Sequence, residues 1–139
     1  LRELENMGVH DIITFDAHDP RVQNSIPLSS FEDVSPALQF TQALLTEYED
    51  LKIDSDHLMF IAPDEGAMQR VVFMASIFGV NIGMFYKRRD YGTIVNGVNP
   101  IVAHDFCGES VKGKDVIVID DMIASGGSMH ATRIAACTK

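Results

Sequence analysis

The sequence has little positive charge and few cysteines. Its 11 lysines and arginines stand against 20 aspartates and glutamates, which gives a net charge of −9. Nucleic acid and anionic membrane surfaces attract clustered Lys and Arg, so we expect neither as the main partner. No apolar run approaches the roughly 20 residues of a membrane span, and no segment has the pattern of a secretory signal peptide. Cys107 and Cys137 match no metal or redox spacing, so we expect reduced thiols in a cytoplasmic protein.

The length of 139 residues suits one domain or a piece of a larger one. Residues 1–7 read as the tail of a helix that leads straight into a strand. Residues 135–139 stop inside a predicted helix that has no Gly or Pro terminator. We therefore expect a fragment of a longer enzyme chain, and we expect the isolated fragment to be weakly active or inactive.

Short apolar runs alternate with amphipathic segments along the chain. Strands are expected at 9–15, 58–62, 81–86 and 115–119, with another in a hairpin or flap at 100–106. Helices are expected at 35–51, at 66–78 and from 129 onward. Strands that alternate with helices imply an α/β fold with a right-handed parallel sheet. Ligands of such sheets bind outside the carboxyl ends of the strands.

An acidic pair directly follows the apolar run at 115–119. Asp120 and Asp121 precede the turn Ser125-Gly126-Gly127-Ser128, and a helix is predicted after it. Paired carboxylates at a strand end can hold neighbouring hydroxyls or a hydrated cation, and glycine-rich backbone at a helix N-terminus can close around an anion. One segment could thus bind a sugar diol and its phosphate. The alternative is a tight turn whose helix is capped by Ser128 and whose acids are solvated.

This segment resembles the loop that binds 5-phosphoribosyl groups in proteins of the phosphoribosyltransferase fold. The usual family form is a hydrophobic strand, two acids, two or three variable residues and then Thr/Ser-Gly-Gly-Thr/Ser. The resemblance implies that Asp120 and Asp121 hold the ribose hydroxyls. It also implies that the 5-phosphate is held by Ser125, Gly126, Gly127 and Ser128.

A second cluster, Asp16-Ala17-His18, follows the first predicted strand. With Gln23 and Ile26-Pro27 it is similar to an element of ribose-phosphate pyrophosphokinases (PRPP synthetases), a branch of this fold that carries Asp-x-His, a Gln and an Ile-Pro. The resemblance implies that Asp16 and His18 help hold Mg²⁺ and nucleotide phosphates. Between Gln23 and Pro27 the chain is shorter than the family and lacks an acid, which puts a second metal position in doubt. The alternative is that His18 only makes a hydrogen bond within its loop.

A third cluster, Pro63-Asp64-Glu65-Gly66, follows the strand predicted at 58–62. It matches the Pro-Asp-x-Gly loop of the same family. The resemblance implies that Asp64, Glu65 and Gly66 accommodate the diphosphoryl group and that Asp64 also reaches Mg²⁺. The family often has two consecutive glycines, whereas Ala67 follows Gly66 here. The alternative, in which Asp64 caps the following helix, can coexist with this function.

The fourth cluster, Lys87-Arg88-Arg89, is a run of positive charge in an acidic chain. It is expected just after the strand at 81–86. The synthetases carry Lys-x-Arg here, at the base of a mobile catalytic loop, so the resemblance implies that Lys87 and Arg89 stabilise charge on the transferring phosphoryl group. The alternative is a solvated run of surface charge. The loop at 90–99 is longer than in many members of the family.

The four motifs together resemble PRPP synthetases from about Gly8 to the end of the chain. The resemblance implies a parallel-sheet, phosphoribosyltransferase-like (type I) domain within a synthetase of two half-domains. Residues 1–30 would be the end of the N-terminal half-domain, and 31–139 most of the C-terminal one, truncated in its last helix. The implied enzyme is a transferase of nucleotide biosynthesis that moves diphosphate from ATP to ribose 5-phosphate, giving PRPP and AMP. Mg²⁺ is the implied cofactor, and the full-length enzyme is expected to be a homo-oligomer.

Two other functions stay open on the sequence. A phosphoribosyltransferase that uses PRPP as donor would share the Asp120 loop, but it would not be expected to carry Asp16-x-His18 or Lys87-x-Arg89. A non-catalytic, synthetase-associated regulatory subunit would share the fold, and the intact Lys87 and Arg89 count only weakly against it. Formation of AMP from ATP and ribose 5-phosphate by the complete protein distinguishes a synthetase from a transferase.

Overall fold

A computed structural model of the chain describes residues 1–89, 92, 101–123, 126–127, 129–130 and 132–133. For residues 87–89 and 101–104 the description covers the backbone only. The chain divides into two units, Leu1–Tyr48 and Glu49–Lys139, and each is described by itself. The half-domain boundary expected after residue 30 stays a prediction. No helix in the described part of the chain is long and apolar enough to cross a membrane.

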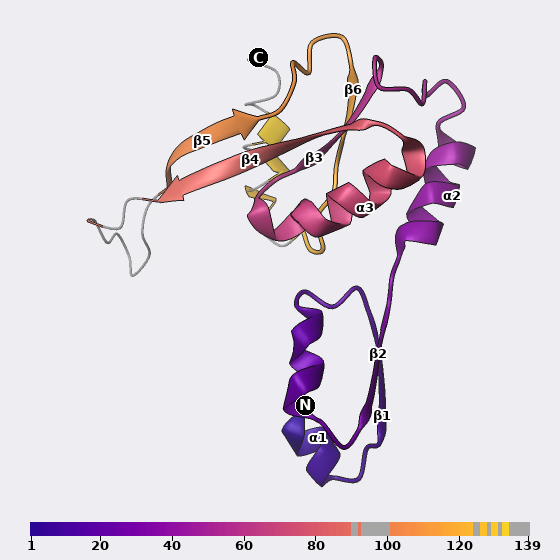
Figure 1. The fold of residues 1–139 in the computed structure, drawn as a ribbon, viewed down its shortest axis with the longest axis vertical. Helices are drawn as coiled ribbons and strands as arrows, with labels where there is room; N and C mark the ends of the chain where they lie inside the picture. Colours follow the sequence, from indigo (N-terminus) through magenta and orange to yellow (C-terminus); the bar gives the residue numbers. More distant parts are fainter. Residues whose placement is uncertain (90–91, 93–100, 124–125, 128, 131, 134–139) are drawn as a thin grey trace. The chain divides into compact units, whose positions relative to one another are not determined.

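The first unit is built on a short parallel sheet (Figure 1). In it β1 (Asp11–Phe15) pairs with β2 (Ser30–Val34) along the full length of both strands. Three helical segments complete the unit: α1 (Arg2–Asn6), the 3-10 helix η1 (Pro20–Ser25) and α2 (Ala37–Glu47). The strand expected at 9–15 is confirmed as β1, and the helix expected at 35–51 is present but ends at Glu47. The sequence did not predict β2, because Ser-Phe-Glu-Asp-Val has neither an apolar run nor a strict alternation.

The second unit contains a four-stranded sheet with the order β5-β4-β3-β6 (Figure 1). The strands are β3 (Leu58–Ala62), β4 (Asn81–Arg89), β5 (Ile101–Cys107) and β6 (Asp115–Val118). β3 is parallel to β4 and to β6, whereas β5 is antiparallel to β4. The expected parallel sheet is thus confirmed for three of the four strands, and the strand expected at 100–106 is present as the hairpin partner of β4.

Strand β3 is the centre of the core, and all five of its residues are fully buried. A continuous apolar strand of this kind is stable only when both of its faces are covered. On one face Phe60 packs against Phe78 of α3 (Met68–Phe78), with 5.4 Å between the ring centroids. On the other face Met59 and Ile61 pack with Phe85 of β4. Full burial of one such side chain stabilises the fold by about 1.5–3 kcal/mol.

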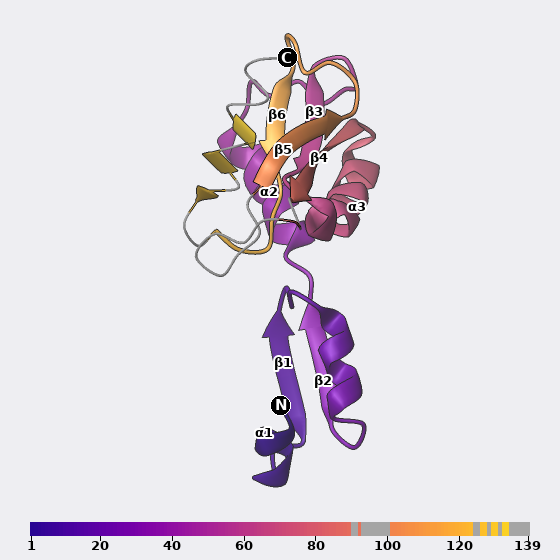
Figure 2. The same ribbon diagram turned by 90° about the vertical axis from the view of Figure 1, so that its left-hand side faces the viewer.

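Helix α3 covers one face of this sheet (Figure 2). It follows the single-turn 3-10 helix η2 (Glu65–Ala67), so two segments stand where the sequence predicts one helix at 66–78. The helix buries Val71, Met74 and Ala75. It ends at Gly79, whose φ of +66° is a left-handed conformation that glycine adopts without a steric penalty. The polar loop that precedes η2 is therefore held at a fixed place beside the end of β3.

Strand β4 is longer than the sequence predicts. The strand expected at 81–86 continues to Arg89, so Lys87 and Arg89 lie within a strand and not in a loop after it. Parallel pairing with β3 extends to Met84, and from Met84 onward β5 pairs with β4 as far as Arg89. The hydrogen bonds that keep this segment extended therefore come from residues distant in the sequence, which the local charge pattern does not reveal.

Candidate functional site

The loops that follow β3 and β6 lie at one edge of the sheet in the second unit (Figure 2). The last register pair is Ile61 opposite Val118, and the N–H of Ile119 then donates to the carbonyl oxygen of Ile61 at 3.1 Å. Because the two strands are parallel, their carboxyl ends meet there. The structure thus brings Asp64 close enough to the acidic pair for its charge to act on Asp120.

The acidic pair is partly buried and internally hydrogen-bonded. The N–H of Asp121 donates to Oδ1 of Asp120 at 3.0 Å, and the side chain of Asp121 is only 10% exposed. Burial raises the pKa of Asp120, and the carboxyls of Asp121 and Asp64 raise it further, against the hydrogen bond from the Asp121 N–H. A cation or a hydroxyl donor that approaches would relieve this cost of ionisation. The pair is therefore suited to a ligand that brings hydroxyls or a hydrated cation.

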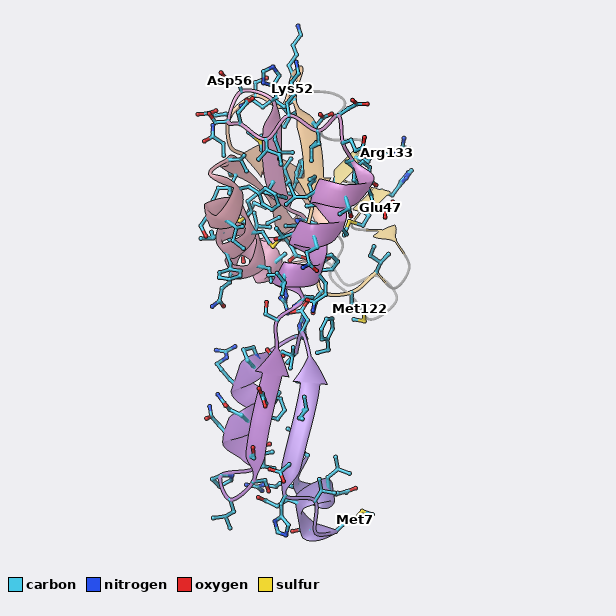
Figure 3. All side chains as sticks on the ribbon, turned by 90° about the vertical axis from the view of Figure 1, so that its right-hand side faces the viewer. Met7, Glu47, Lys52, Asp56, Met122 and Arg133 are labelled. Carbon is cyan, nitrogen blue, oxygen red and sulfur yellow. The ribbon has the colours of Figure 1, made fainter. Side chains whose placement is uncertain are left out.

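A glycine turn and a helix follow the acidic pair, as the sequence predicts. Gly126 has a φ of +74°, and its carbonyl oxygen accepts a hydrogen bond from the N–H of His130 at 2.9 Å. The described residues after Gly126 are helical. Ser125 and Ser128 lie outside the described residues, so their predicted contacts with a 5-phosphate are not placed. Met122, which is 66% exposed, points outward between the acids and the turn (Figure 3).

Asp64 occupies the N-cap of η2. Its Oδ1 accepts a hydrogen bond from the N–H of Gly66 at 3.1 Å, and its backbone is extended. A side chain at Gly66 would place its Cβ 3.3 Å from this same oxygen, so the loop leaves little room there. The capping role that was one of the two sequence interpretations is thus present. The role of Asp64, Glu65 and Gly66 in diphosphate binding stays a prediction.

Arg70 is a component of this site that the sequence analysis missed. Its Nη2 lies 3.9 Å from Oδ2 of Asp121, and the Arg70 side chain is 20% exposed. The signal that could have found it is its place in the helix, because it stands among the buried residues of α3. An arginine on a core-facing stripe needs a partner of opposite charge.

Lys87 and Arg89 are described by their backbone alone. In the hairpin Lys87 lies opposite His104, and Arg89 lies opposite Ile101. The expected catalytic loop at 90–99 falls outside the described residues, except for Gly92. The predicted role of the two basic residues in phosphoryl transfer is therefore left as a prediction.

Asp16 and His18 belong to the first unit, where they follow β1. The N–H of Asp16 donates to the carbonyl oxygen of Val34 at 3.1 Å, and Asp16 has a φ of +53°. The N–H of Ala17 donates to Oδ1 of Asp33 at 2.9 Å. The loop is thus fixed to the end of β2. Because the two units are described separately, the role of Asp16 and His18 as metal ligands stays a prediction.

The next residue in this loop, Asp19, is tied to Arg21 by three hydrogen bonds. Its Oδ1 accepts from the backbone N–H and from Nε of Arg21, at 3.0 and 2.8 Å, and its Oδ2 accepts from Nη2 at 2.8 Å. The side-chain hydrogen bonds and then the backbone one lower the pKa of Asp19 to about 2. Asp19 caps η1, so it gives the loop after His18 a defined end.

The acids at the sheet edge fit magnesium better than a softer metal. No group of three or more His, Cys, Asp or Glu side chains within the described ranges is arranged to hold a metal ion by itself. Mg²⁺ takes hard oxygen ligands, and in phosphoryl-transfer sites it is bound by one or two carboxylates together with water and substrate phosphates. Asp64 and the acidic pair can supply such carboxylates, and the substrate would have to supply the rest.

Comparison with known proteins gives a family model and named relatives that match most of the chain. Residues 32–134 match the phosphoribosyl transferase domain. The ribose-phosphate pyrophosphokinase of Thermococcus kodakarensis is 32% identical over 125 residues, which is 88% of this chain and 39% of the relative. That of Ralstonia nicotianae is 32% identical over 129 residues, which is 91% of this chain and 35% of the relative. That of Pyrococcus furiosus is 30% identical over 134 residues, which is 94% of this chain and 43% of the relative.

The fold is also similar to that of a solved structure. The crystal structure of phosphoribosylpyrophosphate synthetase from Mycobacterium smegmatis matches with a TM-score of 0.74 at 22% identity, over 97% of this chain and 39% of that chain. This confirms the predicted phosphoribosyltransferase-like α/β fold. The chain spans about two fifths of the length of the relatives that it matches.

Proposed function

Because the chain belongs to the phosphoribosyl transferase domain family, we propose that it forms the phosphoribosyl-binding part of a ribose-phosphate diphosphokinase. The complete enzyme transfers the diphosphoryl group of ATP to ribose 5-phosphate, giving PRPP and AMP. The names of the relatives support this assignment, since three that match 88–94% of the chain are ribose-phosphate pyrophosphokinases. The isolated chain binds ribose 5-phosphate weakly and turns over poorly.

One observation carries the proposal: Asp64 and the acidic pair lie at the same edge of the sheet, where the charge of Asp64 acts on Asp120. A glycine turn and a helix directly follow the acidic pair. Asp120 and Asp121 accept hydrogen bonds from the ribose hydroxyls, which is the chemistry that paired carboxylates offer to a diol. The turn at 125–128 then presents backbone N–H groups and the positive end of a helix dipole to the 5-phosphate. One strand end thereby fixes both ends of the sugar phosphate.

The loop Asp64–Gly66 receives the diphosphoryl group beside the sugar. Mg²⁺, when bound, would neutralise charge on the phosphate oxygens, and in the second unit we assign Asp64 to it. In the first unit we assign Asp16 and His18 to Mg²⁺ and nucleotide phosphates, as a separate proposal. Lys87 and Arg89 offset the charge that develops on the transferring oxygens. In the reaction the anomeric oxygen of ribose 5-phosphate attacks the β-phosphorus of ATP, and AMP leaves with the bridging oxygen.

This chemistry needs positioning more than a nucleophilic side chain. The nucleophile is the sugar hydroxyl and the leaving group is AMP, so the protein has to hold the two substrates in line and compensate for charge. The acids for the sugar and the amides for the 5-phosphate both follow β6, whereas the cations for the transferring group stand in the last residues of β4. We include a cytoplasmic location in the proposal, because the cysteines match no metal or redox spacing. We also include a homo-oligomeric full-length enzyme, which the resemblance to PRPP synthetases implies.

The decisive assay mixes the complete protein with ATP, ribose 5-phosphate and Mg²⁺ and measures AMP and PRPP. Equal amounts of both products are expected. Consumption of PRPP with release of pyrophosphate, without AMP formation, would instead identify a phosphoribosyltransferase. If the protein binds ribose 5-phosphate but forms no product from either pair of substrates, it is a regulatory subunit. Ribose without its phosphate is the control ligand, and we expect it to bind more weakly.

A further inference from the structure

We infer that Arg70 is a positioning residue of the phosphoribosyl site, which fixes the carboxylate of Asp121 and links the acidic pair to the helix that follows the Asp64–Gly66 loop. The inference rests on the proposed function, because it assigns to Arg70 a part in binding the sugar phosphate. Arg70 belongs to none of the four sequence motifs.

Arg70 stands on the inner face of α3. Ala67, just before the helix, is 2% exposed and Met74 is 3% exposed; they stand three residues before and four residues after Arg70, the spacings at which helical side chains share a face. The side chain of Arg70 is itself only 20% exposed. A charged side chain that is taken from water to this extent is costly unless an opposite charge compensates for it.

Asp121 supplies that opposite charge. Its Oδ2 lies 3.9 Å from Nη2 of Arg70, and its side chain is 10% exposed. At this separation the attraction is one between charges and not a direct hydrogen bond. Because both side chains are largely buried, solvent and salt screen their attraction less than they would at the surface. The orientation of the Asp121 carboxylate therefore depends on the position of Arg70.

The ion pair also connects the two predicted subsites. Asp121 is joined to Asp120 through its backbone N–H, so a displacement of one acid affects the other. Arg70 lies in the first turn of α3, directly after η2, the 3-10 helix that Asp64 caps. Through Arg70, the helix that begins at the diphosphate loop thus contacts the acids that bind the ribose hydroxyls. A binding group needs such support from a second layer of residues to keep its geometry.

A double-mutant cycle on the full chain tests this inference, with ribose 5-phosphate titrated and binding followed by NMR. We expect Arg70→Gln to weaken binding about tenfold or more, the scale on which outer-layer partners of a binding group act. Asp121→Asn weakens binding at least as much. The double variant binds no more weakly than Asp121→Asn alone, because Arg70 acts through Asp121. Arg70→Lys retains most of the affinity, since it keeps the charge in place.

The matched control is Lys112→Gln, which removes one positive charge from an exposed residue of the same unit, before the amino end of β6. We expect its affinity for ribose 5-phosphate to equal that of the original chain. Losses that add up in the double variant would overturn the inference and leave the proposed function intact. If ribose or inorganic phosphate binds to the original chain as tightly as ribose 5-phosphate does, the proposed function is wrong.

A second readout needs no ligand and separates the two failures. In the free protein, Arg70→Gln and Arg70→Lys should shift the amide resonances of Asp120 and Asp121 more than Lys112→Gln does, while the urea midpoint of Arg70→Lys stays near that of the original chain. If these resonances move no more than in the Lys112 control, Arg70 does not position the acids, whatever the chain binds.

Discussion

The ring of Phe106 on β5 lies directly over Gly83 on β4. A Cβ at Gly83 would lie 2.7 Å from Cε2 and from Cζ of this ring, closer than real side chains approach. The ring cannot easily move away, because it also packs against Phe85 with 5.0 Å between centroids. Gly83 thus leaves the space in which Phe106 joins β5 to β4, and this is the strand pair that carries Lys87 and Arg89.

Gly83→Ala is therefore expected to destabilise the protein. Overpacking of this kind costs about 1–3 kcal/mol in the free energy of unfolding, which outweighs the entropy that alanine saves in the unfolded chain. Urea unfolding measures the change. The control is the double variant Gly83→Ala with Phe106→Leu, in which the smaller side chain makes room and part of the loss is recovered relative to Phe106→Leu alone. Equal losses from Gly83→Ala in both backgrounds would show that the ring is not the obstacle.

Asp64 combines a capping role with its proposed ligand role, and two substitutions separate them. Asp64→Ala removes the acceptor for the Gly66 N–H and should lower the free energy of unfolding by about 1 kcal/mol. Asp64→Asn keeps an acceptor oxygen and should unfold like the original chain. If Asp64 also serves Mg²⁺ and diphosphate, both variants lose Mg²⁺-dependent binding of pyrophosphate. Retention of that binding by Asp64→Asn would leave Asp64 with its structural role only.

The sequence alone predicts those elements that are determined by residues close together in the chain. β3 has five consecutive apolar residues, and its bounds agree with the prediction. The end of α3 was predicted from Gly79, since only a residue that tolerates a positive φ ends a helix in this way. The order of strand, acidic pair, glycine turn and helix around Asp120 was also predictable, because each part has its own local signal.

Elements that depend on a distant partner were not predictable. β2 forms because β1 pairs with it, although Glu32 and Asp33 make its sequence read as a loop. Lys87–Arg89 are extended because β5 provides the hydrogen bonds from residues that follow a long connection. Arg70 shows the same limit at the site: its role depends on where Asp121 arrives after folding, and no spacing in the sequence relates the two.

Asp120 makes the stability of the protein depend on pH in a defined direction. Burial raises its pKa above the ordinary value of 3.8, so the folded state loses stability as the pH rises through the raised pKa. Asp120→Asn cannot ionise and still offers Oδ1 to the Asp121 N–H. We expect this variant to be more stable than the original chain at neutral pH, with the difference disappearing below pH 3.8. Urea midpoints across this range measure it.

The control for Asp120 is Asp115→Asn, at the exposed start of β6. We expect its urea midpoint at neutral pH to stay close to that of the original chain. A lower midpoint for Asp120→Asn at neutral pH would mean that the ionised carboxylate stabilises the fold, which contradicts the direction that burial imposes.

Asp19 is expected to titrate at about pH 2, because the Arg21 side chain and backbone stabilise its charged form. Its lowered pKa contributes stability above the ordinary value of 3.8, and this contribution is lost as the pH falls toward 2. The contribution is small, since the pair is exposed to solvent. Arg21→Gln should raise the pKa of Asp19 toward 3.8, which NMR titration of its carboxyl carbon measures. An unchanged pKa would mean that the backbone N–H alone is responsible.

The last prediction concerns Lys87, whose backbone lies in β4 opposite His104. If its charge acts only on the transferring phosphoryl group, the binding of ribose 5-phosphate does not depend on it. In the complete protein, Lys87→Ala should therefore lower the rate of AMP formation roughly 100-fold or more and leave the dissociation constant for ribose 5-phosphate unchanged. Lys52→Ala, at an exposed residue of the same unit, is the control with unchanged rate and affinity.

A Lys87→Ala protein that keeps its rate would show that Lys87 has no part in the mechanism. One that loses rate and affinity together would place Lys87 on the sugar phosphate itself, because uniform loss means that the contact already exists before the transition state.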